Sequence, residues 1–302
     1  PTALFAYVKD NSGDDGFCTA VSVSGIALTL GSEIEFNNAD SEYIVCTNLD
    51  DDKAVILYND EGASDTFMGI VITASGTTLT ANTEYETGTD YYSKNIAITK
   101  LDTDKFFAIF ESEDDGDGYG VVGTVSGTEI TYGSVTKFTT NNPVYCHATT
   151  IDTDNVVFCY LDTTETDSTL MAATIDGTTI SYGSAIDEDT SVSSSEGQFI
   201  DIVNIDSEHF VFLRNDNSDG FISRYCSIDW TDSSITLGNS ETVATSQRKL
   251  SSVRMNEGDI IVNYYQAITD DGGEMIVGTF NYTTNYKPVI NTQKPDDGSI
   301  NL

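Results

Sequence analysis

The chain has 302 residues, of which 39% are hydrophobic and 10% are aromatic, and this is too much apolar material for a disordered chain. Thirteen Lys and Arg residues stand against 49 Asp and Glu residues, which gives a formal net charge of −36. Such a charge repels phosphate backbones and anionic lipid headgroups, and the longest apolar runs, such as residues 54–57, are far too short to span a bilayer. We therefore expect no nucleic-acid partner and no direct membrane insertion.

The chain begins with a predicted strand, because residues 1–10 resemble the second of the four strands in the repeat unit that is described next. A recurring phrase follows, in which an apolar anchor precedes acidic residues and then an apolar run. The anchors are spaced by 52, 50, 54 and 50 residues, and they are Leu49, Leu101, Ile151, Ile205 and, in a weaker copy, Met255. This even spacing predicts a single repeat domain over residues 1–302, with units beginning near 49, 101, 151, 205 and 255.

Glycine turns keep the same interval as the anchors. They stand at Gly25, Gly76, Gly127 and Gly177, after which residues 229–234 and 281–285 take their place, so the hairpin occurs in six copies. Between the turns, Thr, Val, Ile, Tyr and Phe are concentrated in short runs, and no stretch has a 3.6-residue apolar stripe. Each unit therefore reads as four short strands.

The unit at residues 144–194 illustrates the expected strands, which cover 145–151, 155–161, 170–176 and 178–184. Four strands with a period near fifty residues predict an all-β fold, a six-bladed β-propeller of four-stranded antiparallel blades. The second strand of a unit is apolar at consecutive positions, as expected where both faces of a sheet are covered. A β-helix would need a shorter repeat, and tandem immunoglobulin-like sandwiches would repeat at about 100 residues.

The two ends of the chain complete one another. Residues 299–302 resemble the end of the first strand of other units, at 45–49 and 202–205, whereas residues 1–10 begin as a second strand. We therefore expect one blade to be shared between the termini, with pairing of the N- and C-terminal strands closing the ring and removing its open edge. A chain cut from a longer array at an arbitrary point would show the same ends and stays an alternative.

The phrase "LDTDKF" from residue 101 and the phrase "GTVSGTEITYG" from residue 123 resemble the propeller-type repeats of secreted bacterial adhesins and of tail or fibre proteins of bacterial viruses. The resemblance covers nearly the whole chain. It implies a scaffold that is extracellular or lies on a cell or virion surface, and it implies no catalytic residue.

Acidic loops follow the second strand in nearly every unit, and a particularly acidic one is "ESEDDGDGYG" at residues 111–120. Alternating carboxylates and glycines allow several oxygens to converge on Ca²⁺, which takes about six to eight oxygen ligands. The candidate calcium ligands are Asp114, Asp115 and Asp117. No loop has the complete calcium-hand pattern with its terminal Glu, and Asx and Gly also form ordinary turns, so plain turn chemistry is the alternative.

Three further residues are candidates for ligand binding. Tyr91 and Tyr92 lie in a variable connection at residues 86–95, where their rings could contact a sugar whose hydroxyls donate to nearby carboxylates. Packing of the two rings on neighbouring loops is the alternative. Arg254 lies on an expected first strand, where it could hold an anionic group or pair with surrounding carboxylates.

Catalysis finds little support, because His147 and His209 stand in different units without the spacing typical of zinc or of a nucleophilic triad. We therefore expect a non-enzymatic adhesion or receptor-binding module that recognises glycans or another cell-surface receptor, with Ca²⁺ as the candidate cofactor. Two alternatives stay open. One is a glycan-cleaving hydrolase or lyase that uses a carboxylate pair, and the other is a building block that contacts other subunits of a fibre or surface layer.

Overall fold

The computed structural model describes most of the chain up to residue 279, in the ranges 2–9, 13–24, 27–63, 66–87, 91–165, 167–188, 200–216, 220–244, 249–256, 259–265 and 273–279. These ranges are almost entirely β-strand, and their one short helical turn is the 3₁₀ turn η1 (Glu61–Ala63). None of the described residues forms a helix with the length and hydropathy needed to cross a membrane. The expected all-β fold is confirmed for this part of the chain.

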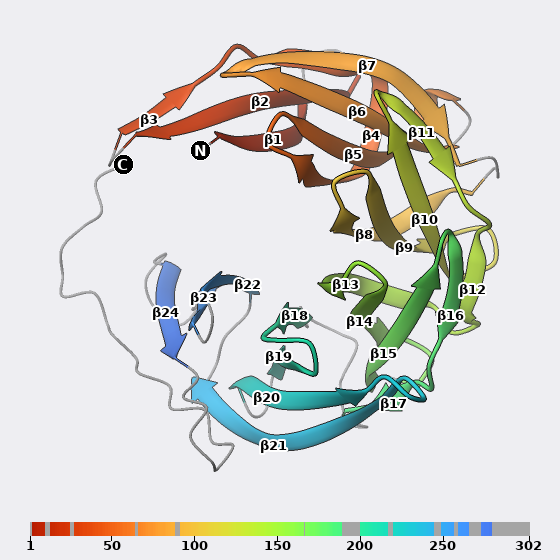
Figure 1. The fold of residues 1–302 in the computed structure, drawn as a ribbon, viewed down its shortest axis with the longest axis vertical. Coiled ribbons are helices and arrows are strands. Elements are labelled where there is room, and N and C mark those ends of the chain that lie inside the picture. Colours follow the sequence, from red (N-terminus) through yellow and green to blue (C-terminus); the bar gives the residue numbers. More distant parts are fainter. Residues whose placement is uncertain are drawn as a thin grey trace. The chain divides into compact units, whose positions relative to one another are not determined.

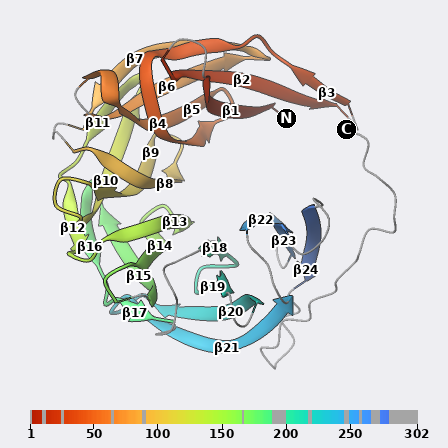
Figure 2. The same ribbon diagram turned by 180° about the vertical axis from the view of Figure 1, so that it is seen from behind.

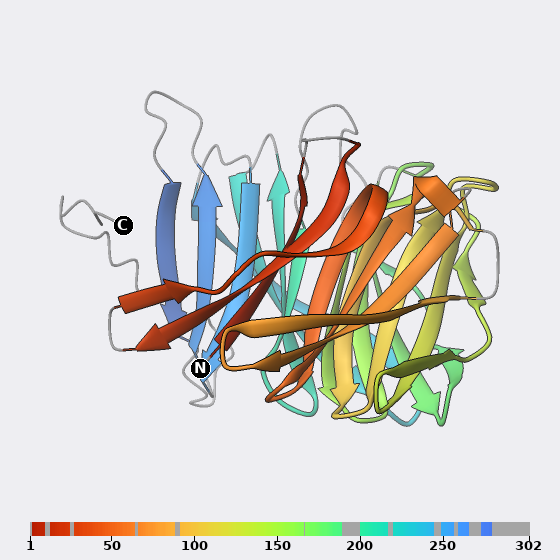
Figure 3. The same cartoon turned by 90° about the horizontal axis from the view of Figure 1, so that it is seen from above.

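The chain divides into two compact units, residues 1–155 with 174–181, and residues 156–173 with 182–302. In the first unit, seven strands form a sheet in the order β1-β2-β4-β5-β6-β7, with β3 paired to β2 (Figure 1). These strands are β1 (Thr2–Lys9), β2 (Asp15–Ser24), β3 (Ala27–Leu30), β4 (Ile34–Asp50), β5 (Lys53–Asp60), β6 (Thr66–Ser75) and β7 (Thr78–Glu86). A second sheet has the order β11-β10-β9-β8, with β12 paired to β10, and its strands are β8 (Ser93–Asp102), β9 (Lys105–Ser112), β10 (Gly118–Ser126), β11 (Glu129–Tyr132) and β12 (Thr136–Thr139). Figure 3 shows the strands of this second, yellow sheet running side by side.

Three further sheets follow along the chain. The first has the order β13-β14-β15-β16 with β17 paired to β15, and its strands are β13 (Pro143–Asp152), β14 (Asn155–Asp162), β15 (Asp167–Asp176), β16 (Thr179–Tyr182) and β17 (Ile186–Asp187). The next has the order β18 (Ile200–Asn204), β19 (His209–Asp216), β20 (Gly220–Asp229), β21 (Ser234–Ala244). The last contains β22 (Lys249–Asn256), β23 (Asp259–Tyr265) and β24 (Gly273–Thr279).

The strand β4 belongs to two repeats at once. Its first residues pair with β2, and from Ser41 onward it pairs with β5 (Figure 2). The first repeat thus holds β1, β2, β3 and the start of β4, and β1 has one neighbour, β2, among the described strands. The strand β1 therefore has the place of a second strand, as the sequence predicts for the start of the chain, whereas residues 299–302 and 281–285 lie outside the described residues.

The second strands carry the buried core of the second, third and fourth repeats. In β5, β9 and β14 every residue after the first is buried, which matches the apolar runs expected for a sheet covered on both faces. In the first unit, Phe67, Phe106 and Phe110 lie in one core cluster that joins the second and third repeats. Packing between successive repeats therefore supplies the core that no single sheet could build alone.

A kink in the fourth strand explains the repeated "GS" of the sequence. The amide of Gly133 donates to the carbonyl of Val122, and a Cβ at Gly133 would lie 2.6 Å from Cβ of Thr178, in the turn of the next repeat. Gly31 and Gly183 make the equivalent bonds and closely approach Thr77 and Ser233 in the turns that follow. Glycine at this position lets successive repeats approach each other within each unit.

The second repeat keeps this bond with another residue type. Asn82 stands where the other copies have glycine, and its side-chain Nδ2 donates to the carbonyl of Val71 at 2.8 Å. A side-chain amide thus takes the place of the glycine N–H. Three of the four predicted turn glycines are confirmed, because Gly76, Gly127 and Gly177 have φ values of +63°, +64° and +63°, whereas Gly25 lies outside the described residues.

Candidate functional site

Three residues at equivalent places in successive repeats have left-handed backbone conformations. Tyr43, Asn95 and Tyr145 have φ values of +50°, +49° and +53°, and each precedes its repeat's anchor residue by six positions. In β4 the pairing shifts register between Glu42 and Val45, and in β8 it shifts between Lys94 and Ala97, so Tyr43 and Asn95 lie in β-bulges.

Two of these three left-handed residues are aromatic, and their side chains reach solvent. Tyr43 is 40% exposed and Tyr145 is 39% exposed, although most large apolar side chains on the described strands are buried. Asn95, in the repeat between these two, contacts the second of them, because its Oδ1 accepts a hydrogen bond from the amide of Tyr145 at 3.2 Å. The left-handed region is unfavourable for tyrosine, and such residues occur often at ligand-binding sites.

Carboxylates lie around Tyr92, which precedes Asn95 by three positions. The Tyr92 hydroxyl donates to Glu42 Oε2 at 3.0 Å and lies 3.2 Å from Glu61 Oε1. Burial and these acceptors raise the pKa of the Tyr92 hydroxyl, so it stays a donor at neutral pH. The amide of Glu113 donates to the Tyr92 carbonyl at 2.9 Å, which holds the next carboxylate beside the same tyrosine.

A lysine completes this arrangement. Lys94 Nζ lies 2.6 Å from Glu113 Oε1 and 5.0 Å from the centroid of the Tyr92 ring. The hydrogen bond to Glu113 is the main reason why the pKa of Lys94 is raised. Both side chains are partly exposed, so solvent weakens this ion pair.

Glu111 is the deepest of the carboxylates, since the residue is only 7% exposed. Its Oε2 accepts a hydrogen bond from Asn95 Nδ2 at 2.5 Å, and burial raises its pKa above the ordinary value. We call the whole group the bulge cluster, and its members are Glu42, Tyr43, Glu61, Tyr92, Lys94, Asn95, Glu111, Glu113 and Tyr145. It can offer aromatic rings, hydroxyl and amide groups and several hydrogen-bond acceptors to a polar ligand.

The structure separates the two tyrosines predicted to bind a sugar. Tyr92 belongs to the bulge cluster, whereas the Tyr91 ring packs 5.6 Å from the Phe110 ring and 4.9 Å from the Tyr119 ring. Arg254 lies on β22 as expected for a first strand, and its side chain is outside the described residues. The sugar-binding role of all three residues stays a prediction.

Two of the predicted calcium ligands, Asp115 and Asp117, contact other groups of the protein. Asp115 Oδ1 accepts from the amide of Asp117 at 3.1 Å, and Asp115 Oδ2 accepts from the Tyr119 hydroxyl at 2.7 Å. Asp117 pairs with Lys137, and Asp114 is exposed on the turn. Their role in calcium binding stays a prediction.

Three other carboxylates converge in the second unit. Among the described His, Cys, Asp and Glu residues, ligand atoms of Glu165, Asp167 and Asp187 lie within 4.8 Å of one another. Thr169 Oγ1 donates to Asp187 Oδ1 at 3.0 Å and so helps to hold this group. Three carboxylates provide fewer oxygens than Ca²⁺ usually takes, although bidentate binding and water can complete such a site.

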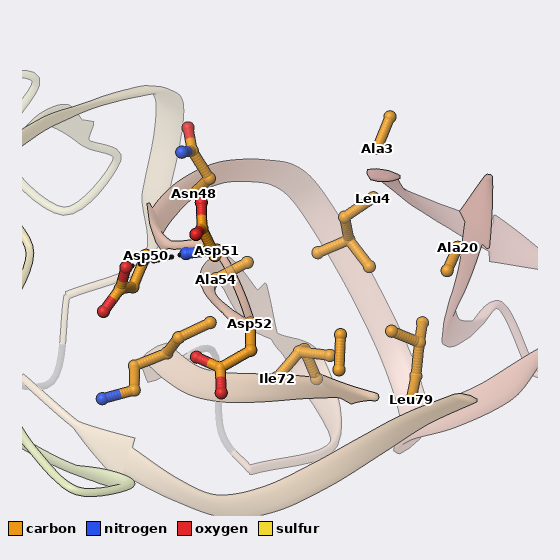
Figure 4. A pocket seen from close by; sticks show the side chains of 12 residues that line it. Ala3, Leu4, Ala20, Asn48, Asp50, Asp51, Asp52, Ala54, Ile72 and Leu79 are labelled. Carbon is orange, nitrogen blue, oxygen red and sulfur yellow. Dashed lines mark hydrogen bonds between the residues drawn. The ribbon is translucent and has the colours of Figure 1, made fainter. Parts of the chain in front are cut away.

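A small cavity lies at the acidic turn of the second repeat. Leu4, Ile72 and Leu79 from three strands face it, and residues 50–52 form part of its rim (Figure 4). Its volume is about 60 Å³. Ligand pockets usually measure about 300–1,000 Å³, so this cavity has room for water but not for a sugar.

Sequence reasoning missed Tyr43, Asn95 and Tyr145, although their shared place six residues before the anchors was a visible signal. Asn is one of the few residues that tolerate the left-handed region, but two tyrosines at the same place hide that preference. It also missed Asp187, because nothing in the sequence shows that β17 returns to pair with β15.

No protein-family model and no curated protein matches the chain. The chain is similar in structure to a putative 6-phosphogluconolactonase from Bacteroides uniformis, with 14% identity, a TM-score of 0.65, and coverage of 97% of this chain and 80% of that one. It is also similar to the BP39L lectin from Burkholderia pseudomallei, with 9% identity, a TM-score of 0.59, and coverage of 96% of this chain and 83% of that one. A protein from Lactobacillus plantarum shows 12% identity and a TM-score of 0.63 over 96% of this chain and 81% of that one. At such low identity these similarities show the fold alone, and the chain has a propeller-like all-β fold.

Proposed function

We propose that this protein is a non-enzymatic, glycan-binding module that acts in adhesion or receptor binding outside the cell or on a virion. One observation carries the proposal: Tyr43 and Tyr145 occupy the same left-handed place in different repeats with exposed rings, and the Tyr43 hydroxyl lies near the carboxylates of Glu42, Glu111 and Glu113. A tyrosine ring offers an apolar face to the C–H groups of a sugar, and the carboxylates accept hydrogen bonds from its hydroxyls.

The backbone strain supports this interpretation. A left-handed conformation costs a residue other than glycine about 1–2 kcal/mol, and Asn bears it better than Tyr. A protein that needed only the bulge would be served by Gly or Asn, as Asn95 shows in the third repeat. Tyrosine at two of these three places is explained if its exposed ring contacts the ligand.

The comparison with a lectin is a second, weaker support. BP39L is named a lectin, and its fold resembles that of this chain. Fold alone does not determine function, so the bulge cluster has to carry the argument.

A glycan array tests the proposal. Purified protein is applied with and without Ca²⁺, and the bound glycans are then analysed for cleavage. We expect binding without cleavage, and we expect a Tyr43→Ala/Tyr145→Ala double variant to lose it. Phe5→Ala is the matched control, because Phe5 is another exposed aromatic residue of the same unit and lies outside the bulge cluster. Binding that is equal in the double variant would contradict this site.

Glu111 favours a second candidate function, a glycan-cleaving hydrolase or lyase. It is a buried carboxyl with a raised pKa, the property of a general acid in glycoside cleavage. A second, weaker support is that the similar structure from Bacteroides uniformis is named a putative 6-phosphogluconolactonase, which is an enzyme. Cleavage of an array glycan by wild-type protein but not by Glu111→Gln would decide for this alternative.

We propose six blades for the propeller-like fold, with residues 299–302 pairing to β1 to close the ring. The six hairpin copies and the single described neighbour of β1 support this arrangement. If the array detects no glycan and the protein self-associates, the remaining candidate is a building block of a fibre or surface layer.

A further inference from the structure

We propose that the bulge cluster selects sugars that carry a free ammonium group, that is, amino sugars without an N-acetyl group. The inference rests on the proposed glycan-binding function and names its ligand class. Its first support is that the protein already places an ammonium group there. Lys94 Nζ lies over the Tyr92 ring and beside Glu113, which is the pairing of aromatic face and carboxylate that recognises a cation.

The charge of the cluster exceeds what this lysine can balance. Lys94 is its single basic residue, and Glu42, Glu61, Glu111 and Glu113 are its acidic ones. Glu113 pairs with Lys94, whereas Glu42 and Glu61 accept hydrogen bonds from Tyr92, and Glu111 accepts one from Asn95. A cationic ligand would therefore gain attraction that a neutral ligand would not, and an anionic sugar would be repelled.

Buried polar groups without a hydrogen-bond partner lie at positions next to Glu42 and Tyr92 in the strands. Asn59 stands opposite Glu42 in the β4–β5 pair, and Asn59 Oδ1 accepts from the amide of Ser93, next to Tyr92, at 3.2 Å. Both side chains are fully buried, and Asn59 Nδ2 and Ser93 Oγ have no hydrogen-bond partner within the described structure. Buried donors of this kind normally hold a partner such as water or a ligand oxygen.

These observations together describe a site for a polyhydroxylated cation. The exposed Tyr43 ring lies near Lys94 and Glu111, whose charges act on its hydroxyl. The carboxylates suit an ammonium group, the tyrosines suit the apolar face of a sugar ring, and the buried donors suit a hydroxyl oxygen or a bridging water. An N-acetyl group removes the positive charge and so removes the attraction that distinguishes this ligand class.

Calorimetric titration tests the inference with two probes, a β-1,4-linked glucosamine tetrasaccharide and its fully N-acetylated form, in about 150 mM salt, where attraction between distant exposed charges is largely screened. We expect the amine form to bind about tenfold more tightly, the scale of one cation–π contact with added charge attraction. Glu42→Gln keeps an acceptor for the Tyr92 hydroxyl and removes the charge, so it should abolish the preference. Glu129→Gln removes the same charge from an exposed residue of β11, outside the cluster, and should leave the preference unchanged.

Three outcomes would overturn the inference. Equal binding of both probes would refute the ammonium preference and leave the glycan-binding function intact. A preference weakened equally by Glu42→Gln and Glu129→Gln would show general attraction to an acidic protein. Binding of neither probe, with no glycan bound on the array, would refute the inference together with the proposed function.

Discussion

Leu28 in the first repeat and Ile130 in the third stand three residues after the turn glycine, but Leu28 is 61% exposed and Ile130 is 4% exposed. Ile130 is buried because it packs on the preceding repeat, where its Cδ1 would lie 3.3 Å from a Cβ at Gly69. Leu79, the corresponding residue of the second repeat, is buried as well. The same local pattern thus gives a core residue only where another repeat covers it.

The first test of this comparison replaces each residue by alanine. Ile130→Ala should lower the free energy of unfolding by about 2–5 kcal/mol, the usual cost of truncating a buried aliphatic side chain. The proposed ring closure predicts that Leu28 is covered in solution by the end of the chain, so Leu28→Ala should cost a similar amount. Urea unfolding of both variants measures this. A Leu28→Ala change within about 0.5 kcal/mol of wild type would contradict closure and favour an open array.

The kink of the fourth strand gives the next largest effect. Gly133→Ala should cost about 1–3 kcal/mol, because the added Cβ would collide with Thr178 in the next turn. Asn82→Ala, at the same place in the second repeat, should cost about 1 kcal/mol, the net value of one hydrogen bond. Thermal unfolding of the two variants compares them. An unchanged unfolding temperature in Gly133→Ala would show that the close approach of the repeats is not needed for stability.

Tyr145→Asn tests how residue type at the left-handed position affects stability. It gives the fourth repeat the residue type that Asn95 has in the third, and it should raise the free energy of unfolding by about 1 kcal/mol by relieving left-handed strain. Chemical unfolding measures the change. Destabilisation by more than about 1 kcal/mol would mean that packing of the ring outweighs the strain.

The predicted calcium binding has two candidate locations, and the expected shift in Tm is the smallest effect, about 2 °C. Asp114→Asn/Asp117→Asn tests the loop predicted from sequence, and Asp167→Asn tests the group with Glu165 and Asp187. The variant that loses the calcium-dependent rise in Tm identifies the location. No rise in the wild-type protein would contradict calcium binding at both places.

Much of the fold followed from local signals. The strands expected at 145–151, 155–161, 170–176 and 178–184 correspond to β13, β14, β15 and β16, because apolar runs and turn glycines repeat at a fixed interval. Blade number and ring closure depend on residues 281–302, which lie beyond the described ranges, and those two predictions stay open.

The candidate site was harder to predict than the strands. Tyr92 was named from its aromatic type, but the partners Glu42 and Glu61 come from the preceding repeat, and pairing between repeats decides which carboxylates meet. The left-handed conformation of Tyr43 and Tyr145 is not revealed by residue type, because tyrosine does not favour it.

The most direct test of the central claim is calorimetric titration of the best-binding array glycan into wild-type protein and Tyr145→Asn. The variant puts at this left-handed position a residue type that tolerates it and removes one exposed ring, so folding and binding can be judged separately. We predict at least about tenfold weaker binding by the variant, or about 1.4 kcal/mol. Equal affinity of the two proteins would contradict the assignment of glycan binding to the bulge cluster.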